Sequence, residues 1–275
     1  HDARGLAELG RLARSMGSQV FVKPMEHQNI RTLINVRRTM LKNRARTDAL
    51  IQSIFRLYGG NVKLLNGRGA LAAEVNDQVR KMRQHELEIG VNLQPLVEIA
   101  EALREQISIL DRQMRDIASN NPTCRNFQTI PGVGAVIALS FYSAIGDPYR
   151  FERSRDVGAY LGLTPTLYQS GATSRRGRIS RHGNKLTRMH LITAATVLLC
   201  RIEIESRLRT WGLELAQRVG FLKARVAVAR KLAVIMLGMW KSGSPFRPDG
   251  TSSLFLQQEE AGLDPVLISG TQISL

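Results

Sequence analysis

Apolar residues recur at helical spacing over two long stretches, which predict two long amphipathic helices. The first covers residues 26–58 and ends at Gly59 and Gly60, a pair that favours helix termination. The second covers residues 85–119, where an apolar residue recurs every seven positions, as in a coiled coil interrupted by Gln106 and Gln113. Its expected seam is Leu96, Ile99, Leu103, Ile107, Leu110, Met114 and Ile117. Such narrow stripes pair with each other or with a second copy of the chain, so a helical hairpin and a dimer arm both remain open.

Shorter patterns set the rest of the organisation. Residues 3–16 have helical spacing behind Asp2, which stands where an N-cap is expected. Residues 66–78 read as a looser connection, and a compact helical domain follows the second long helix. The last segment is rich in Ser, Gly, Gln and Thr, a composition typical of poor order. The predicted fold is mainly α, with four regions at residues 1–24, 25–120, 121–246 and 247–275.

The charge balance narrows the class of partner. The formal net charge is +16 and the pI is about 10.8, which predicts a polyanion, either nucleic acid or an anionic membrane. There is no run of about 18 apolar residues, and the long helices lack a broad apolar face with Trp or Phe, so we expect no membrane partner. Two cysteines, Cys124 and Cys200, are too few for a disulfide framework or a metal site, which favours a reduced, cytoplasmic setting. Because the chain begins at His1, we expect it to be part of a longer reading frame.

The first long helix carries a one-sided charge pattern. Between Ile30 and Arg56 there are seven basic residues and one acidic residue, Asp48. A solvated helix face usually mixes both signs, so this face is a candidate for contact with phosphates, and a merely soluble face remains the alternative. The candidate residues are Arg37, Arg38, Lys42 and Arg44.

A glycine turn opens the compact domain at residues 130–134, with the sequence Ile-Pro-Gly-Val-Gly. An apolar residue, Pro-Gly, an apolar residue and a second Gly before a helix are typical of a helix-hairpin-helix turn. There Gly132 and Gly134 would let the backbone approach a phosphate at a helix start. The alternative is a tight corner between helices that binds no ligand.

The most basic stretch follows at residues 170–188. No Asp or Glu occurs from Val157 to Ile202, and six basic residues fall in this one stretch, which reads as a loop with three glycines. Arginine can hold phosphate through two N–H groups at once, so we expect contact with nucleic acid here. The candidates are Arg175, Arg176, Arg178, Arg181, Lys185 and Arg188.

Several motifs in one order resemble the C-terminal domain of insertion-sequence transposases of the 110/116/902 family. They are Pro-Gly-x-Gly, Ile-Gly-Asp with Arg-Phe, Tyr-Leu-Gly-Leu-x-Pro, Gln-Ser-Gly and Ile-Ser-x-x-Gly-Asn, within residues 121–246. Residues 2–16 resemble the end of the family's RuvC-like domain more weakly, which would make residues 1–24 the remnant of an α/β domain. The resemblance implies a recombinase that acts on DNA, a structured noncoding RNA as a second partner, and assembly into a homo-oligomer.

The resemblance also implies two half-sites. One is a serine nucleophile in the Gln-Ser-Gly motif, here Ser170. The other is a set of four acids that binds a divalent metal such as Mg²⁺, of which Asp2 would be the last. The three other acids would lie before His1, and no internal cluster replaces them. One carboxylate holds a divalent cation weakly. We therefore expect this chain to bind nucleic acid without cutting it.

A noncatalytic nucleic-acid-binding module with a helix-hairpin-helix turn is the alternative function. Without the resemblance, Ser170 would read as an ordinary turn residue. Replacing Ser170 separates the two hypotheses, because only the recombinase depends on its hydroxyl group.

Overall fold

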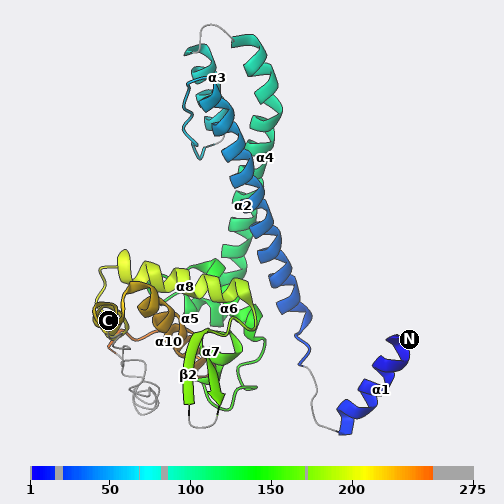
Figure 1. Ribbon diagram of the computed structural model, residues 1–275, viewed down its shortest axis with the longest axis vertical. Helices are drawn as coiled ribbons and strands as arrows, with labels where there is room; N and C mark the ends of the chain where they lie inside the picture. The colour runs from blue at the N-terminus through cyan, green and yellow to red at the C-terminus, as the bar shows by residue number, and fades with distance from the viewer. Residues whose placement is uncertain (1, 16–20, 68, 82–85, 171–172, 250–275) are drawn as a thin grey trace.

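The computed structural model describes residues 2–15, 21–67, 69–81, 86–170 and 173–249 (Figure 1). It confirms the mainly α prediction, with helices throughout and one two-stranded sheet among the described residues. The elements are α1 (Asp2–Ser15), α2 (Met25–Leu57), α3 (Ala70–Lys81), α4 (Glu86–Asn120), α5 (Pro122–Phe127), α6 (Ala135–Ile145), α7 (Asp156–Tyr160), β1 (Pro165–Ser170), β2 (Thr173–Ile179), α8 (Lys185–Cys200), α9 (Arg207–Val219) and α10 (Phe221–Ser242). Residues 250–275 of the predicted tail lie outside the described residues.

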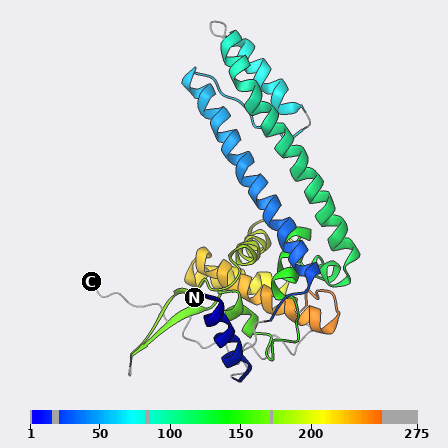
Figure 2. The ribbon, with the colours of Figure 1, turned by 90° about the vertical axis from the view of Figure 1, so that its right-hand side faces the viewer.

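Helices α2 and α4 run side by side and form an arm that extends from a compact body (Figures 1 and 2). Their bounds lie within a residue of the two long helices that the periodicity predicts. Of the two pairings left open by the sequence, the structure shows the one in which these helices pack on each other. The base of the arm is continuous with the core of the body, because Ile30 and Met114 are buried in that core.

The far end of the arm corrects the prediction of a looser connection at residues 66–78. Residues 70–81 form α3, which packs against α4. Its buried residues, Leu71, Val75 and Val79, recur every four positions and join Ile51 and Phe55 in a second apolar cluster. The start of α3 is capped from α4, because the Glu101 carboxylate accepts hydrogen bonds from Gly69 N at 3.0 Å and Ala72 N at 3.1 Å. The sequence did not predict this helix, because Gly67 and Gly69 directly before it indicate a loop and its capping residue lies on another helix.

The buried seam of α4 is shifted from the one expected. Leu93, Ala100, Ile107 and Met114 recur every seven residues and are buried, whereas Ile99 is 51% exposed. The alternating seam positions are Val97, Arg104, Asp111 and Ala118. Arg104 and Asp111 therefore occupy places that a coiled coil usually gives to apolar residues, and their charges hid the true seam.

Both charged seam residues of α4 find partners on α2. Arg104 Nη2 lies 2.8 Å from Asp48 Oδ1, with the two side chains 10% and 9% exposed. Arg37 forms an ion pair with Asp111 one layer nearer the body. Paired charges at seam positions favour one register of two helices over the others. These two ion pairs occupy the middle of the arm, between the apolar clusters at its ends.

We expect Asp48→Leu to lower the free energy of unfolding by about 3 kcal/mol or more, because it leaves the buried Arg104 guanidinium without its carboxylate. The double variant Asp48→Leu/Arg104→Leu should recover most of the loss, since it removes the buried guanidinium together with its carboxylate, and Arg44, the second partner of Asp48, is 32% exposed. Urea denaturation measures the free energy of unfolding of the wild type, the single variant and the double variant. Asp77→Ala is the control, because the Lys81–Asp77 pair is 61% and 53% exposed and such pairs contribute at most about 1 kcal/mol. A double variant no more stable than Asp48→Leu would contradict this account.

The body is built around α10. Its residues Val228, Leu232 and Met236 are fully buried, and α7, α8 and α9 pack against it. Helix α5 joins this core through Phe127, whose ring lies edge-on to Phe141 of α6 and to Trp240 of α10. No helix of the described residues is long and apolar enough to cross a membrane.

Strands β1 and β2 correct a second expectation, because most of the basic stretch expected as a loop forms an antiparallel hairpin. The strands pair from Pro165 with Ile179 at the base to Ser170 with Thr173 at the tip. One extra residue in β2 makes a bulge opposite Thr166, which increases the local twist. Figure 2 shows the hairpin extending away from the helices of the body.

Candidate nucleic-acid interface

Two glycines lock the base of the hairpin to the body. Both have a left-handed backbone, with φ of +67° at Gly162 and +73° at Gly183. A Cβ on Gly162 would lie 2.3 Å from His182 O, and one on Gly183 would lie 2.1 Å from Tyr160 O. The segments on either side of the hairpin therefore approach more closely than any side chain allows. These glycines belong to the Tyr-Leu-Gly-Leu and Gly-Asn motifs, so two motifs distant in sequence form one joint.

Arg188 holds the same joint from below and is not on the surface. Its side chain is buried at 7% exposure, and Nη1 donates to Leu161 O at 2.9 Å and to His182 O at 2.8 Å. Burial, followed by the nearby charge of Arg181, lowers the pKa of Arg188. The expectation of nucleic-acid contact gives way here to a positioning role, because the guanidinium is used within the chain.

The other predicted residues of the basic stretch lie along the hairpin and beyond its base. Arg178 and Arg181 are exposed, and Arg181 has a φ of +58°. Lys185 is exposed at the start of α8. Arg175 and Arg176 lie in β2, where they pair through the backbone with Tyr168 and Leu167. Ser170 is the last residue of β1, and the side chains of residues 167–176 lie outside what the structure describes.

The glycine turn joins α5 to α6, and its two glycines have different surroundings. Gly132 has a φ of +90°, and a Cβ there would lie 3.0 Å from Ala194 O of α8. It therefore allows close packing between the turn and α8, as the tight-corner alternative requires. Gly134 is exposed directly before α6 with open space around it. Only Gly134 of the two is placed to meet a ligand from outside.

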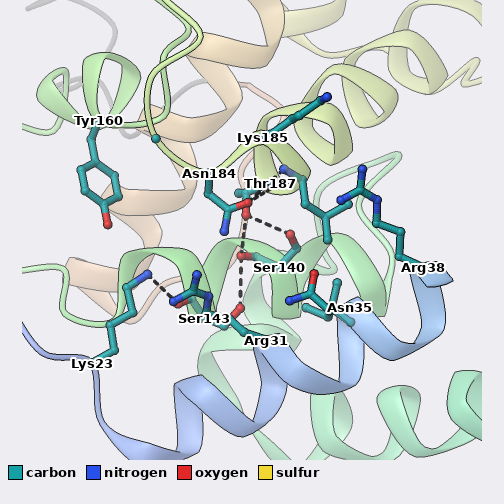
Figure 3. Close-up of a pocket in the computed structure, with 13 residues that line it drawn as sticks. Lys23, Arg31, Asn35, Arg38, Ser140, Ser143, Tyr160, Asn184, Lys185 and Thr187 are labelled. Atoms are coloured by element: carbon teal, nitrogen blue, oxygen red, sulfur yellow. Dashed lines mark hydrogen bonds between the residues drawn. The ribbon is translucent and has the colours of Figure 1, made fainter.

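A basic pocket of about 450 Å³ lies where the start of α2, α6 and the start of α8 meet (Figure 3). Lys23, Arg31 and Arg38 border it from the α2 side, and Lys185 borders it from α8. None of the lining residues is acidic. The polar residues that line it further are Asn35, Ser140, Ser143, Tyr160, Asn184 and Thr187.

Buried hydroxyl groups fix the walls of the basic pocket to each other. Thr187 Oγ1 donates to Ser140 O at 3.1 Å and lies 3.1 Å from Ser140 Oγ, which joins α8 to α6 (Figure 3). Asn184 caps α8, accepting hydrogen bonds from Leu186 N and Thr187 N. The first turn of α8 is thus held in place, and the positive end of its dipole faces the pocket.

Burial and neighbouring charges shift titrations around the basic pocket. Burial first, and then the charges of Arg31 and Arg150, lower the pKa of Lys23 from 10.5 to about 8. Lys23 Nζ donates to Ser143 O at 3.0 Å and also to Ala144 O. On the neighbouring side of α8, burial and then the charges of Arg37 and Arg38 lower the pKa of His190 to about 4. His190 is therefore neutral at pH 7.

The pKa of Lys23 gives a pH dependence of stability. Below pH 8 the side chain is charged in the folded and the unfolded chain, so the folded chain carries the full cost of a buried charge. As pH rises from about 8 to 10.5, only the folded chain loses the proton. We expect the wild-type free energy of unfolding to rise over this window relative to Lys23→Met, in phosphate-free urea titrations. A difference between the two proteins that stays constant from pH 7 upward would contradict the shifted pKa.

The basic residues predicted on α2 divide into those with a carboxylate partner and those without one among the described residues. Arg37 is bound to Asp111, and Arg44 Nε lies 3.9 Å from Asp48 Oδ2. Both therefore have acidic partners inside the arm. Lys42 is exposed, and Arg38 lines the basic pocket. The sequence reading counted these charges correctly, but it could not show which of them were already matched.

Two residues of the basic pocket, Lys23 and Arg31, were not among the predicted site residues. A signal for Arg31 exists, because Arg31, Asn35 and Arg38 are spaced four and three residues apart and so share one face of α2. Lys23 precedes the helix and has no such pattern. Its role depends on the position of α6, which the sequence does not show.

Asp2 is the first residue of α1, and its side chain lies outside the described part of the structure. Figure 1 shows α1 apart from the body. Within the described residues, no group of three or more His, Cys, Asp or Glu side chains could hold a metal ion. The described residues therefore do not fit a complete divalent-metal site.

A hairpin that extends from the body, a basic pocket at its base and a long two-helix arm define a strongly basic, mainly helical protein. The model of the family "Transposase IS116/IS110/IS902 family" matches residues 124–210, which contain the glycine turn, the hairpin and α8. The transposase for insertion sequence element IS1111A of Coxiella burnetii is 30% identical over 260 residues, which cover 90% of this chain and 67% of that protein. The chain belongs to this family of insertion-sequence transposases.

Two further relatives agree with this assignment. A probable family 20 transposase of Pseudomonas aeruginosa is 28% identical over 253 residues, covering 90% of this chain and 73% of that protein. The transposase for insertion sequence element IS1328 of Yersinia enterocolitica is 33% identical over 145 residues, covering 52% of this chain and 43% of that protein. The resemblance read from the motifs is thereby confirmed.

Proposed function

We propose that this transposase exchanges DNA strands through Ser170, which the hairpin presents to a DNA phosphate. The observation that carries the proposal is the place of Ser170 as the last residue of β1, at the tip of a hairpin that extends from the body (Figure 2). A group at such a tip can reach into a bound duplex, while the joint at Gly162 and Gly183 fixes the direction of the hairpin.

The proposed step leaves the number of phosphorus–oxygen bonds unchanged. The Ser170 hydroxyl oxygen attacks a DNA phosphorus, a phosphorus–oxygen bond to serine forms, and the bond to one deoxyribose oxygen breaks. That oxygen leaves as an alcohol, taking up one proton for the one that serine loses. A second alcohol can reverse the step and rejoin strands without an external energy source. Arg175, Arg176 and Arg178 lie in the paired strand and would stabilise the charge on the phosphorus in the transition state.

A serine hydroxyl is a weak nucleophile at neutral pH and needs activation. The family resemblance implies, beside this serine, a divalent metal bound by four acids in a RuvC-like domain, of which Asp2 is the candidate here. Since the described residues offer no cluster of acids, we propose that the 275 residues alone bind DNA without cutting it. Metal-dependent strand exchange by these residues alone would overturn this part of the proposal.

The arm is the proposed surface for a structured RNA and for a second copy of the chain. Lys42, Arg46 and Arg56 are exposed along α2, and a polyanion can follow such a row. Leu50 and Ile99 are 46% and 51% exposed on the same arm, as expected for helices that assemble further.

The test of the catalytic proposal is a covalent protein–DNA adduct. The transposase is expressed from the longest open reading frame that contains this sequence and is incubated with duplex DNA that carries the element ends. A denaturing gel then separates free DNA from DNA that is covalently attached to protein, and we expect the attached form with the wild type and none with Ser170→Ala. Strand exchange without any adduct would favour direct attack by another nucleophile.

A further inference from the structure

We propose that the basic pocket binds one backbone phosphate of the DNA duplex, at a fixed distance from the phosphate that meets the hairpin tip. This inference rests on the proposed function, because it takes DNA as the substrate. It assigns a positioning site separate from Ser170 and includes residues, Lys23 and Arg31, that the basic hairpin does not contain.

The first argument is unmatched charge. Two arginines of the arm have carboxylate partners, since Arg37 pairs with Asp111 and Arg104 pairs with Asp48. Among the described residues, Arg31, Arg38 and Lys185 form no salt bridge, although all three border one hollow together with Lys23. Four like charges around one hollow repel one another, and a bound anion removes that repulsion. The lowered pKa of Lys23 has the same origin in part, since Arg31 contributes to it.

The second argument is shape. A hollow of about 450 Å³ is large enough for a phosphate with part of its sugar and too small for a base pair as well. Its cations come from both sides, with Arg31 and Arg38 on α2 and Lys185 on α8 (Figure 3). One guanidinium group can bind two phosphate oxygens at once. Arg31 and Arg38 on α2 could therefore hold a phosphate from one side while Lys185 on α8 faces it from the other.

The third argument is position. Tyr160 and Gly183 line the pocket and also form the joint at the base of the hairpin. The six residues of β1 span about 20 Å at roughly 3.3 Å per residue. Ser170 at the tip therefore lies about 20 Å from the start of β1, a length that corresponds to about six base pairs along the axis of a DNA duplex at about 3.4 Å each. A phosphate held in the pocket would fix the register of the duplex against the hairpin.

The experiment compares two matched charge reversals. Arg31→Glu/Lys185→Glu reverses two exposed cations of the pocket. Arg218→Glu/Lys223→Glu reverses two exposed cations on α9 and α10, outside the pocket lining, and changes the net charge equally. Fluorescence anisotropy measures the affinity of each full chain for a duplex DNA of about 25 base pairs between 50 and 200 mM salt. A structured RNA of similar length and inorganic phosphate are the other two probes, and circular dichroism checks the fold.

We expect the pocket variant to bind duplex DNA at least about 10-fold more weakly than the control variant. Its slope of log affinity against log salt should fall by about one relative to the control, because that slope counts neutralised phosphates and the pocket holds one. Equal losses in the two variants would overturn the proposal, since they would reflect net charge alone. So would a loss confined to RNA, or stabilisation by inorganic phosphate with unchanged DNA affinity.

The result also separates this inference from the proposed function. If the wild-type chain binds no duplex DNA, the proposed function fails and the pocket proposal fails with it. If the wild type binds DNA and the pocket variant binds it as tightly as the control variant, the pocket proposal alone fails.

Discussion

In the transposase expressed from the longest open reading frame that contains this sequence, replacing Ser170 with alanine is expected to abolish strand exchange and the covalent adduct, while DNA affinity stays within about twofold of the wild type. The substitution removes the attacking oxygen, and loss of a nucleophile lowers enzymatic rates by about 10³-fold or more. It removes no charge, so the electrostatic term that dominates affinity for DNA is unchanged. Loss of this one oxygen atom is therefore expected to separate DNA binding from the chemical step.

A matched control for Ser170 stands directly opposite it. Thr173 pairs with Ser170 at the tip of the hairpin, and Thr173→Ala also removes a hydroxyl group from that tip. We expect Thr173→Ala to retain strand exchange within about threefold, because no role in bond formation is assigned to it. If Ser170→Ala keeps more than a tenth of the wild-type rate, the serine is not the nucleophile, and the noncatalytic binding module becomes the better description of this domain.

The long helices were predictable because their apolar patterns are long and their ends carry local signals. The bounds of α2 and α4 agree with the periodicity to within a residue. Helix α3 was not predictable by the same means. Its start is capped by Glu101 of α4, and its buried apolar pattern consists of only three residues. A cap supplied by a distant element leaves no trace in the neighbouring sequence.

In the candidate site, too, the sequence shows which residues are charged but not which of them are already paired within the chain. Sequence reading located the basic stretches on α2 and around β2, and several of their residues, such as Arg178 and Lys185, are exposed. It could not distinguish them from Arg188, which binds two backbone carbonyls, or from Arg37, which binds Asp111. Whether an arginine is free depends on what lies within a few ångströms of it, and that is set by tertiary packing.

The motif glycines show what the family resemblance left unexplained. Gly162 and Gly183 were noted as parts of two motifs with no reason for either glycine. In the structure they face each other's backbone, so each motif is needed by the other. Their joint lies at the base of the hairpin and borders the basic pocket, and it therefore links the two proposed contacts with DNA.

Gly183→Ala is accordingly expected to cost about 4 kcal/mol or more of the free energy of unfolding, or to prevent folding of the body. The new Cβ would lie 2.1 Å from Tyr160 O, so the two backbone segments have to separate. Separation also breaks the joint that Arg188 completes through Leu161 O and His182 O, leaving a buried guanidinium with fewer acceptors. Urea denaturation followed by circular dichroism measures the change.

Comparison with Gly243→Ala isolates the steric part of this effect. Gly243 has a φ of +68°, close to the +73° of Gly183, but a Cβ there meets nothing within 4 Å. Its substitution should cost only the backbone strain, about 1–2 kcal/mol. The difference between the two variants then measures the close approach at the hairpin base. If they differ by less than about 1 kcal/mol, the joint is loose, and the hairpin direction that both DNA contacts depend on is not fixed by these glycines.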